Sequence, residues 1–330
     1  MPVPFDDAPD APQLEVKLRP RTLDDYIGQN QVKRALRLFI DAGKQRGGAL
    51  EHILFYGPPG MGKTTLAHIV ARELEGELKI TSGPAIEKTG DLAAILTNLQ
   101  DNDVLFIDEI HRLPRAVEEA LYPVMEELAL DIVLGKGAGA RTVRLSVPRI
   151  VVIGATTRMS LLSAPFRDRF GLVLRLDYYT EEDITQIVER SAEILGVPMT
   201  HDVARSVAQR ARRTPRIANR ILKRARDLYE MNTAETVSPV LLEKLFDILD
   251  IDPAGLNHID VKYLRTILEK FDGGPVGLST LATSLSEDMH TIEEYIEPFL
   301  IQLGLMKKTP KGRVLTEAGI HHIGMSTARK

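Results

Sequence analysis

The segment best equipped for chemistry is Gly57–Thr65, which reads Gly-Pro-Pro-Gly-Met-Gly-Lys-Thr-Thr. It matches the phosphate-binding pattern G-x-x-x-x-G-K-[ST]. In such a loop, glycines such as Gly60 and Gly62 let backbone N–H groups surround a phosphate, and Lys63 supplies a point charge. Thr64 would place its hydroxyl where a phosphate-bound Mg²⁺ accepts it as a ligand. The pattern therefore predicts a nucleotide phosphate site.

A strand and a helix are needed to position this loop. The preceding run 52–56 is typical of a buried strand, and the residues after the loop repeat on one helical face, at Leu66, Ile69, Val70 and Leu74. The alternative is a glycine-rich turn ahead of a core helix. The complete order of strand, loop, Lys-Thr pair and helix favours the phosphate loop instead.

A second candidate element is Asp103–Glu109. Its four apolar residues predict a fully buried strand, which delivers two adjacent carboxylates at the end where parallel α/β sheets bind ligands. Asp108 is placed to hold Mg²⁺, and Glu109 could activate an attacking water as general base. The alternative is an acidic pair that merely ends a surface strand.

Further polar residues follow a third apolar strand, 150–155. Thr157 could reach between the two carboxylates and the γ-phosphate, or could equally cap a helix. Arg167 and Arg169 come next, and an arginine that reaches a neighbouring subunit's γ-phosphate is worth about 10³–10⁵ in rate. The sequence does not decide which role each of these arginines has. Arg216 would start a helix that points back toward the nucleotide.

Composition limits the class of protein. The 330 residues, 44% hydrophobic and 27% charged, are ordinary globular composition with room for about two or three domains. The absence of cysteine excludes disulfides and thiolate metal sites, and no apolar run is long enough to span a membrane, so a cytoplasmic location is expected. The net charge of −4 argues that any nucleic-acid contact needs a local basic surface.

The pattern of the chain divides it into four parts. Residues 1–15, acidic and without Lys or Arg, predict a mobile arm. Residues 16–179 predict a parallel α/β sheet, with strands at 53–56, 78–81, 104–108, 150–155 and 173–176. Residues 180–253 are helical throughout. Residues 254–330 predict three helices and a hairpin turning at Thr309–Gly312, the pattern of a DNA-binding winged helix.

Polar residues predict two helix starts in the last part. Asp260 is expected to cap one helix, and Thr291 has capping-box spacing at the start of another. Residues 250–255, with proline and glycine, are expected to be a linker that ends the preceding helix.

A second hairpin is predicted near 130–147. Apolar residues alternate on both sides of a glycine-rich turn at 135–139, namely Leu130, Ile132, Leu134, Val143, Leu145 and Val147. Either this hairpin packs on its own domain, or its tip at Val143 and Leu145 forms an exposed apolar docking patch. The sequence leaves both possibilities open.

Together these motifs resemble the AAA+ ATPases, and they closely resemble the RuvB family, the motors of Holliday-junction branch migration. The matching stretches are 18–20, 26–29, 57–65, 81–84, 106–113, 154–158, 167–171 and 214–220, and the resemblance extends from Leu14 to the final hairpin. It implies an α/β fold with a AAA+ P-loop NTPase parallel sheet, a helical lid domain and a C-terminal winged helix. It also implies homohexameric rings around duplex DNA.

The resemblance also implies roles for residues at matching positions around ATP. Lys63, Thr64 and Thr65 would hold phosphates and Mg²⁺, with Asp108 and Glu109 as the metal and water-activating pair. Thr157 would be the first sensor, Arg169 the arginine finger acting on the adjacent subunit, and Arg216 the second sensor. Leu18, Arg19, Ile27 and Tyr179 would surround adenine and ribose.

For the partners, the resemblance implies that Lys308 and Arg313 touch DNA phosphates and that the Val143 and Leu145 tip docks on RuvA, with RuvC as a further partner. Two positions depart from the family pattern. Arg213 stands where relatives usually have glycine, which puts the lid geometry in doubt. Met289 stands where many relatives have a basic residue, so one DNA contact is expected to be missing.

The favoured hypothesis is an ATP-driven motor that moves duplex arms through a junction in DNA recombination, repair and the SOS response. The alternative is a nucleotide-switched AAA+ module for DNA loading, similar to replication initiators, which would bind ATP tightly and turn it over little. A phosphoryl-transferring kinase is disfavoured by the adjacent carboxylates Asp108 and Glu109.

Overall fold

The computed structural model describes residues 16–45, 50–134, 141–232 and 235–327. The acidic arm expected at 1–15 and the glycine-rich turn at 135–139 lie outside these residues. The chain forms two compact units. The first extends to Ile194 and includes Thr214–Ile217, and the second contains Leu195–Arg213 and the remainder from Ala218.

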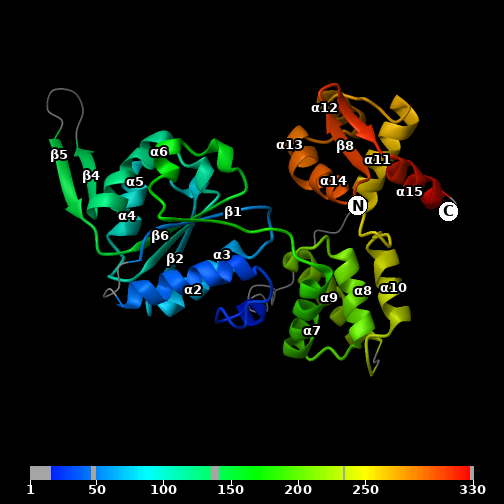
Figure 1. Ribbon diagram of the computed structural model, residues 1–330, viewed down its shortest axis with the longest axis horizontal. Coiled ribbons are helices and arrows are strands. Elements are labelled where there is room, and N and C mark those ends of the chain that lie inside the picture. The colour runs from blue at the N-terminus through cyan, green and yellow to red at the C-terminus, as the bar shows by residue number, and fades with distance from the viewer. Residues whose placement is uncertain (1–15, 46–49, 135–140, 233–234, 328–330) are drawn as a thin grey trace. The chain divides into compact units, whose positions relative to one another are not determined.

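A five-stranded parallel sheet forms the centre of the first unit (Figure 1). Its order is β2-β3-β6-β1-β7. The strands are β1 (Ile53–Tyr56), β2 (Leu78–Ser82), β3 (Val104–Asp108), β6 (Val151–Thr156) and β7 (Leu172–Arg175). The predicted parallel α/β fold is therefore confirmed, with strand ends displaced by a residue at most.

Helices cover both faces of this sheet, which explains why its central strands are apolar without interruption. On one side, β-strand residues such as Leu54, Leu105 and Val152 pack in a fully buried cluster with α4 and α5. Figure 1 shows α2 and α3 on the other side. The helices of this unit are α2 (Asn30–Gln45), α3 (Lys63–Glu73), α4 (Thr89–Leu96), α5 (Arg115–Glu127), α6 (Ala164–Arg167) and α7 (Glu181–Leu195), with short 3₁₀ turns at Gly83–Ala85, Ile110–Arg112 and Met159–Leu161.

The predicted hairpin is formed by β4 (Ala129–Leu134) and β5 (Arg141–Ser146), and it extends away from the sheet (Figure 1). Leu130 pairs with Leu145, and Ile132 pairs with Val143. Leu130 is buried and Leu145 is partly buried against the core of its own domain, whereas Val143 is 39% exposed. The base of the hairpin thus packs on its domain, and the exposure expected of both tip residues is found only for Val143.

The second unit contains a helical part followed by a winged helix. Its elements are α8 (His201–Arg210), α9 (Pro215–Met231, whose first residues group with the first unit), α10 (Pro239–Ile248), α11 (His258–Phe271), α12 (Leu278–Leu285), α13 (Met289–Thr291), a π-helical turn (Ile292–Ile296), α14 (Glu297–Gln302), β8 (Met306–Thr309), β9 (Gly312–Leu315) and α15 (Glu317–Thr327). The sequence did not predict α15. Within the described residues, no helix combines the length and the apolarity needed to cross a membrane.

Both predicted helix caps in the winged helix were wrong by one turn. Asn257 is the true N-cap of α11, because its side chain accepts a hydrogen bond from the Asp260 backbone N–H at 3.1 Å. Asp260 instead completes the capping box by accepting from the Asn257 N–H at 2.8 Å. Similarly, Asp288 accepts from the His290 N–H, and Thr291 lies inside the helix that follows. Each true cap is an Asx residue three positions upstream, the residue type that favours this position.

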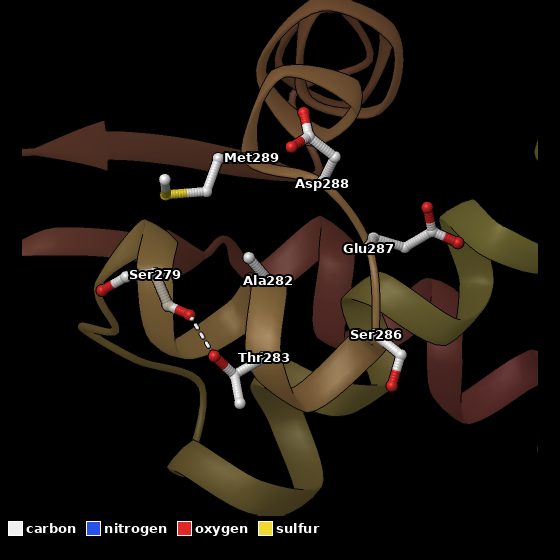
Figure 2. A pocket seen from close by; sticks show the side chains of 7 residues that line it. All are labelled: Ser279, Ala282, Thr283, Ser286, Glu287, Asp288 and Met289. Carbon is white, nitrogen blue, oxygen red and sulfur yellow. Dashed lines mark hydrogen bonds between the residues drawn. The ribbon is translucent and has the colours of Figure 1, made fainter.

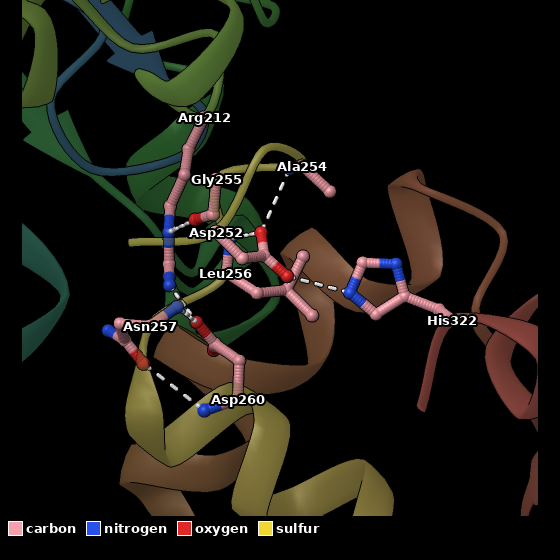
Figure 3. A network of polar contacts seen from close by, with 8 residues as sticks. All are labelled: Arg212, Asp252, Ala254, Gly255, Leu256, Asn257, Asp260 and His322. Atoms are coloured by element: carbon pink, nitrogen blue, oxygen red, sulfur yellow. Dashed lines mark hydrogen bonds and ion pairs between the residues drawn. The ribbon is translucent and has the colours of Figure 1, made fainter. Parts of the chain in front are cut away.

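The predicted linker 250–255 is held by polar contacts at both ends (Figure 3). From the helical part, Arg212 donates to the Gly255 carbonyl at 3.2 Å and forms an ion pair with Asp260, whose side chain is fully buried. From α15, His322 Nε2 lies 2.7 Å from a carboxylate oxygen of Asp252. The Arg212 guanidinium also lies 4.7 Å from the ring centroid of Phe299. These contacts join the helical part to the winged helix within one unit.

Candidate active site

The phosphate loop lies between β1 and α3, as its sequence predicted. Gly60 and Gly62 have positive φ angles of 78° and 97°, a conformation that glycine adopts without the steric cost of a side chain. A Cβ atom on Gly62 would lie 2.4 Å from the Tyr26 hydroxyl, so no other residue fits there without displacement. Because α3 begins at Lys63, the unpaired N–H groups of its first turn face the loop.

Two buried tyrosines contact the phosphate loop at the Met61 carbonyl. The sequence analysis assigned no role to Tyr26. The Tyr26 hydroxyl donates to the Met61 carbonyl at 3.0 Å. The Tyr179 hydroxyl lies 2.9 Å from that of Tyr26 and 3.1 Å from the same carbonyl. Burial raises the pKa of Tyr179 to about 12 and holds that of Tyr26 well above its ordinary value, so both remain protonated donors. The only signal in the sequence was that Tyr26 begins the family-like stretch 26–29.

Lys63 is held by the loop itself. Its ammonium group donates to the carbonyls of Gly57 and Pro58, both at 2.8 Å, and the residue is 8% exposed. Burial lowers the pKa of Lys63 to about 8, although the nearby charge of Asp108 acts in the opposite direction. A bound phosphate would compete with these two carbonyls for the ammonium group.

The two predicted carboxylates diverge at the end of β3. Asp108 ends the strand, where its side chain accepts from the Glu109 N–H at 2.9 Å. Glu109 has a left-handed backbone with φ 46°, and its carboxylate forms an ion pair with Arg112 at 2.9 Å. The charge of Asp108 therefore acts on the lysine of the loop, whereas the Glu109 carboxylate is paired with Arg112.

The donor set fits Mg²⁺ bound mainly through a nucleotide. Thr64, half-buried in the first turn of α3, and Asp108 each offer one oxygen group near the loop. Mg²⁺ is usually held by one or two protein groups together with phosphate and water oxygens. Among the residues that the structure describes, no group of three or more acidic or histidine side chains could form a metal site without the nucleotide.

The predicted first sensor, Thr157, directly follows β6 and is exposed. Because β6 lies between β3 and β1, this residue emerges between the acidic pair and the phosphate loop. The preceding Thr156 is 1% exposed and bonds through its hydroxyl to His111 Nδ1 at 2.9 Å. This partly buried pair, which the sequence did not indicate, fixes the end of β6 against the turn that follows Glu109.

Arg216, the predicted second sensor, lies against the loop. It is exposed in the first turn of α9, and a Cβ atom on Gly60 would lie 3.2 Å from the Cβ of Arg216. Arg212 and Arg213, just before it, both have left-handed backbones with φ 52° and 53°. Arg213 therefore adopts the conformation that glycine favours, at a steric cost of about 1–2 kcal/mol. Arg213 thus differs from the family's usual glycine in its side chain, while its backbone keeps a conformation typical of glycine.

Of the residues expected around adenine and ribose, Arg19 lies against α3 and Leu18 against α7. Arg19 contacts His68 of α3 at 2.6 Å, and Leu18, which is buried, has its carbonyl bound by Arg190 at 3.1 Å. Ile27 is partly buried in the segment that begins with Tyr26. A cavity of about 210 Å³ opens beside Tyr179 and the start of α2.

Arg169, the predicted finger, is docked on its own domain and away from the loop's helix. Its guanidinium lies 4.0 Å from the centroid of the Tyr122 ring and 3.2 Å from a carboxylate oxygen of Glu126, both on α5. It also donates to the Pro165 carbonyl at 2.6 Å. The side chain is 22% exposed, so it lies at the domain surface and not in the interior.

The predicted DNA contacts, Lys308 and Arg313, lie opposite each other on β8 and β9, and both form ion pairs with Glu293 and Glu297. A shallow groove of about 420 Å³ lies elsewhere in the winged helix (Figure 2), lined by Ser279, Ala282, Thr283, Ser286, Glu287, Asp288 and Met289. Its charged residues are acidic and Met289 is 47% exposed, so this groove offers no cation to a phosphate.

Comparison with known proteins places this arrangement in a family. The RuvB P-loop domain model ("Holliday junction DNA helicase RuvB P-loop domain") matches residues 18–176. The RuvB AAA lid domain matches 179–252, and the RuvB C-terminal winged helix domain matches 253–324. The chain belongs to the RuvB family. It is therefore a P-loop ATP hydrolase with a helical lid and a winged helix.

Similar proteins agree along nearly the whole chain. Holliday junction branch migration complex subunits RuvB from Chloroflexus aggregans and Chloroflexus aurantiacus are each 55% identical to it, covering 98% of this chain and 92% of theirs. The solved structure of the Thermotoga maritima RuvB Holliday junction branch migration motor has a TM-score of 0.84 at 45% identity, over 93% of this chain and 98% of that one. The Aeropyrum pernix ORC2 protein, at 18% identity and TM-score 0.56, shares the fold alone.

Proposed function

We propose that this chain is the ATP-hydrolysing motor subunit that drives branch migration of Holliday junctions by moving duplex DNA through a ring. The observation that carries the proposal is the convergence of Lys63, Asp108 and Arg216 on one phosphate loop, in a chain that also has a winged helix. Relatives that are named branch migration subunits support the choice of substrate.

ATP binding in this proposal begins at the loop. The N–H groups of the first turn of α3 and the ammonium group of Lys63 would take the phosphates, displacing the Gly57 and Pro58 carbonyls from Lys63. Thr64, Thr65 and Asp108 would hold Mg²⁺ and its water shell, and that ion would neutralise charge on the β- and γ-phosphates. Leu18, Arg19, Ile27 and Tyr179 would enclose the base and ribose.

Hydrolysis would use Glu109 and Arg169, each of which has another partner in the structure. Glu109 would leave Arg112 and accept a proton from the attacking water, with Thr157 orienting that water. Arg216 would report the γ-phosphate to the lid. Arg169 would leave its site on α5 and reach the γ-phosphate bound by the adjacent subunit.

The assembly in this proposal is a homohexamer around duplex DNA, located in the cytoplasm. RuvA would bind the hairpin through Val143, which is exposed, with Leu145 contributing from its partly buried position. RuvC would act on the same junction. The domain limits that we propose are an arm at 1–15, an ATPase domain at 16–179, a lid at 180–253 and a winged helix at 254–330.

A junction-dissociation assay with and without ATP and RuvA tests the motor. Lys63→Ala should lose ATP binding, and Glu109→Gln should keep ATP binding while turnover falls about 10²–10⁴-fold, because a general base contributes that much. Both variants should fail to dissociate junctions. Glu230→Gln, which removes an exposed carboxylate near the end of α9, is the matched control and should retain activity.

Unchanged branch migration by Lys63→Ala would reject the motor. An intact protein that binds ATP and junctions but neither turns over ATP nor moves the branch point would favour the alternative, a nucleotide-switched DNA-loading module.

A further inference from the structure

The wing of the winged helix presents its two predicted DNA-binding cations as a pair. Lys308 on β8 and Arg313 on β9 are directly opposite in the antiparallel register, so their side chains lie on the same face of the hairpin. The Lys308 side chain is 44% exposed and that of Arg313 is 15% exposed. A phosphate approaching this face would meet Lys308 first.

The buried carboxylate of Glu297 forms ion pairs with both cations from the interior side of the wing. Glu297 is fully buried, and its carboxylate accepts from Arg313 Nε at 2.8 Å, from Lys308 Nζ at 2.6 Å and from the Tyr263 hydroxyl at 2.8 Å. Burial alone would raise the pKa of Glu297, but these hydrogen bonds together hold it below its ordinary value. Glu297 therefore remains ionised and is a permanent part of the wing.

A second carboxylate reaches the same cations from the solvent side. Glu293 precedes Glu297 by one helical turn, and its carboxylate lies 3.1 Å from Arg313 Nη2 and 3.8 Å from Lys308 Nζ. Unlike Glu297, the Glu293 side chain is 40% exposed. The two cations and two carboxylates of this cluster sum to zero charge, so Lys308 and Arg313 contribute no net positive charge while Glu293 stays in place, whereas Lys307 and Lys311 of the same hairpin are exposed.

We propose that Glu293 occupies the position of a DNA phosphate and that duplex DNA binds the wing by displacing it. This inference rests on the proposed function, in which Lys308 and Arg313 contact the DNA backbone. The exchange replaces one singly charged anion by another, since a phosphodiester and a carboxylate each carry one negative charge. Glu297 keeps both cations oriented throughout, and Glu293 acts as an internal competitor that weakens each contact.

Such a competitor suits a protein that must release DNA as well as bind it. If the phosphate contact had no competitor, its whole binding free energy would have to be lost at every release step. With Glu293 present, the cations are paired again as the phosphate leaves. Unpaired cations in a partly dry surface are costly, so the exchange lowers the barrier to leaving.

The test compares affinities of the full chain for a fluorescent duplex at one fixed salt concentration, by anisotropy. Glu293→Gln should bind about two- to fivefold more tightly, which is the range that a partly exposed ion pair spans. Glu287→Gln removes the same charge from the acidic groove of the same domain. Its change in the logarithm of Kd should be less than half of the change for Glu293→Gln. Thermal unfolding of both variants checks that the fold is retained.

The decisive arm is the combination with Lys308→Gln. That single change should weaken binding, and adding Glu293→Gln to it should give a smaller gain than in the wild-type background, because Lys308 is one of the two cations that Glu293 contacts. Unchanged or weaker binding by Glu293→Gln alone would overturn the inference, as would an equal gain with Lys308→Gln present. If Lys308→Gln leaves binding unchanged, the assignment of a DNA contact to Lys308 fails, and the inference fails with it. A loss for Lys308→Gln with no gain for Glu293→Gln would reject the competitor alone.

Discussion

At the scale of the residue, Lys63 is the group whose protonation should respond to nucleotide. In the free chain its burial lowers the pKa to about 8. Bound phosphates favour the charged form, so they must raise this pKa. ATP binding is therefore expected to be coupled to partial protonation of Lys63, whose side-chain nitrogen donates to the Gly57 and Pro58 carbonyls.

Proton uptake on binding of a non-hydrolysable ATP analogue is the corresponding prediction. At pH 8 about half of the free protein carries neutral Lys63, so binding should take up about half a proton, and little at pH 7. Affinity should be flat below pH 7 and fall as pH rises above 8. Calorimetry in buffers of different ionisation enthalpy measures this uptake. Lys63→Arg keeps the charge and is the control, and equal uptake by both proteins would contradict the assignment.

The sequence could predict those residues of the site that lie within contiguous motifs. Lys63 and Asp108 lie in short segments whose spacing is fixed by a strand, a turn and a helix. The pairs that hold the site together were not predictable, because they form only on folding. Thr156 and His111 are 45 positions apart, and the Tyr26 and Tyr179 hydroxyls are joined across 153 positions.

At the scale of the element, local patterns predicted most helices and strands but missed α15. A Cβ atom on Gly319 would lie 2.1 Å from the Leu305 carbonyl, so α15 needs glycine there to approach the start of the wing. Glycine disfavours the helix by about 1 kcal/mol relative to alanine, which weakens the helical pattern in the sequence. The close contact thus accounts for the glycine, and the glycine accounts for part of the weak helical signal.

The junction between the helical part and the winged helix gives a prediction at this scale. Burial outweighs Arg212 and raises the pKa of Asp260 to about 6. Arg212→Ala would leave this carboxyl without its cation, and breaking such a buried pair costs about 3–5 kcal/mol. Without Arg212 the pKa of Asp260 rises further, so the folded variant can bind a proton there at a higher pH than the wild type.

The stability deficit of Arg212→Ala should therefore grow as pH rises through about 6, and it should be smaller at pH 5 than at pH 8. Calorimetric unfolding at the two pH values measures it. Arg213→Ala has the same left-handed backbone but an exposed side chain, so it should lose less than about 1 kcal/mol with no pH trend. A deficit for Arg212→Ala that is equal at both pH values would contradict the role of Asp260.

At the scale of the whole molecule, one chain contains every part of the proposed catalytic site, but it does not bring them to one place. Lys63, Asp108 and Arg216 meet at the phosphate loop, whereas Arg169 is bound to Tyr122 and Glu126 on α5. The proposed ring would resolve this separation, since head-to-tail contacts can bring the α5 surface of one subunit to the nucleotide of the next.

Mixing two inactive variants tests whether Arg169 acts between subunits. Arg169→Ala should bind ATP but lose hydrolysis by about 10³-fold or more, and Lys63→Ala should not bind ATP. In mixed rings, a site with Lys63 from the first variant can receive Arg169 from the second, so random assembly should restore roughly one interface in four. ATP turnover of the mixture measures this, with Arg167→Ala as the control for losing a nearby arginine. Complementation can arise only if the guanidinium crosses the interface, so a mixture as inactive as its components would place Arg169 outside the neighbouring site.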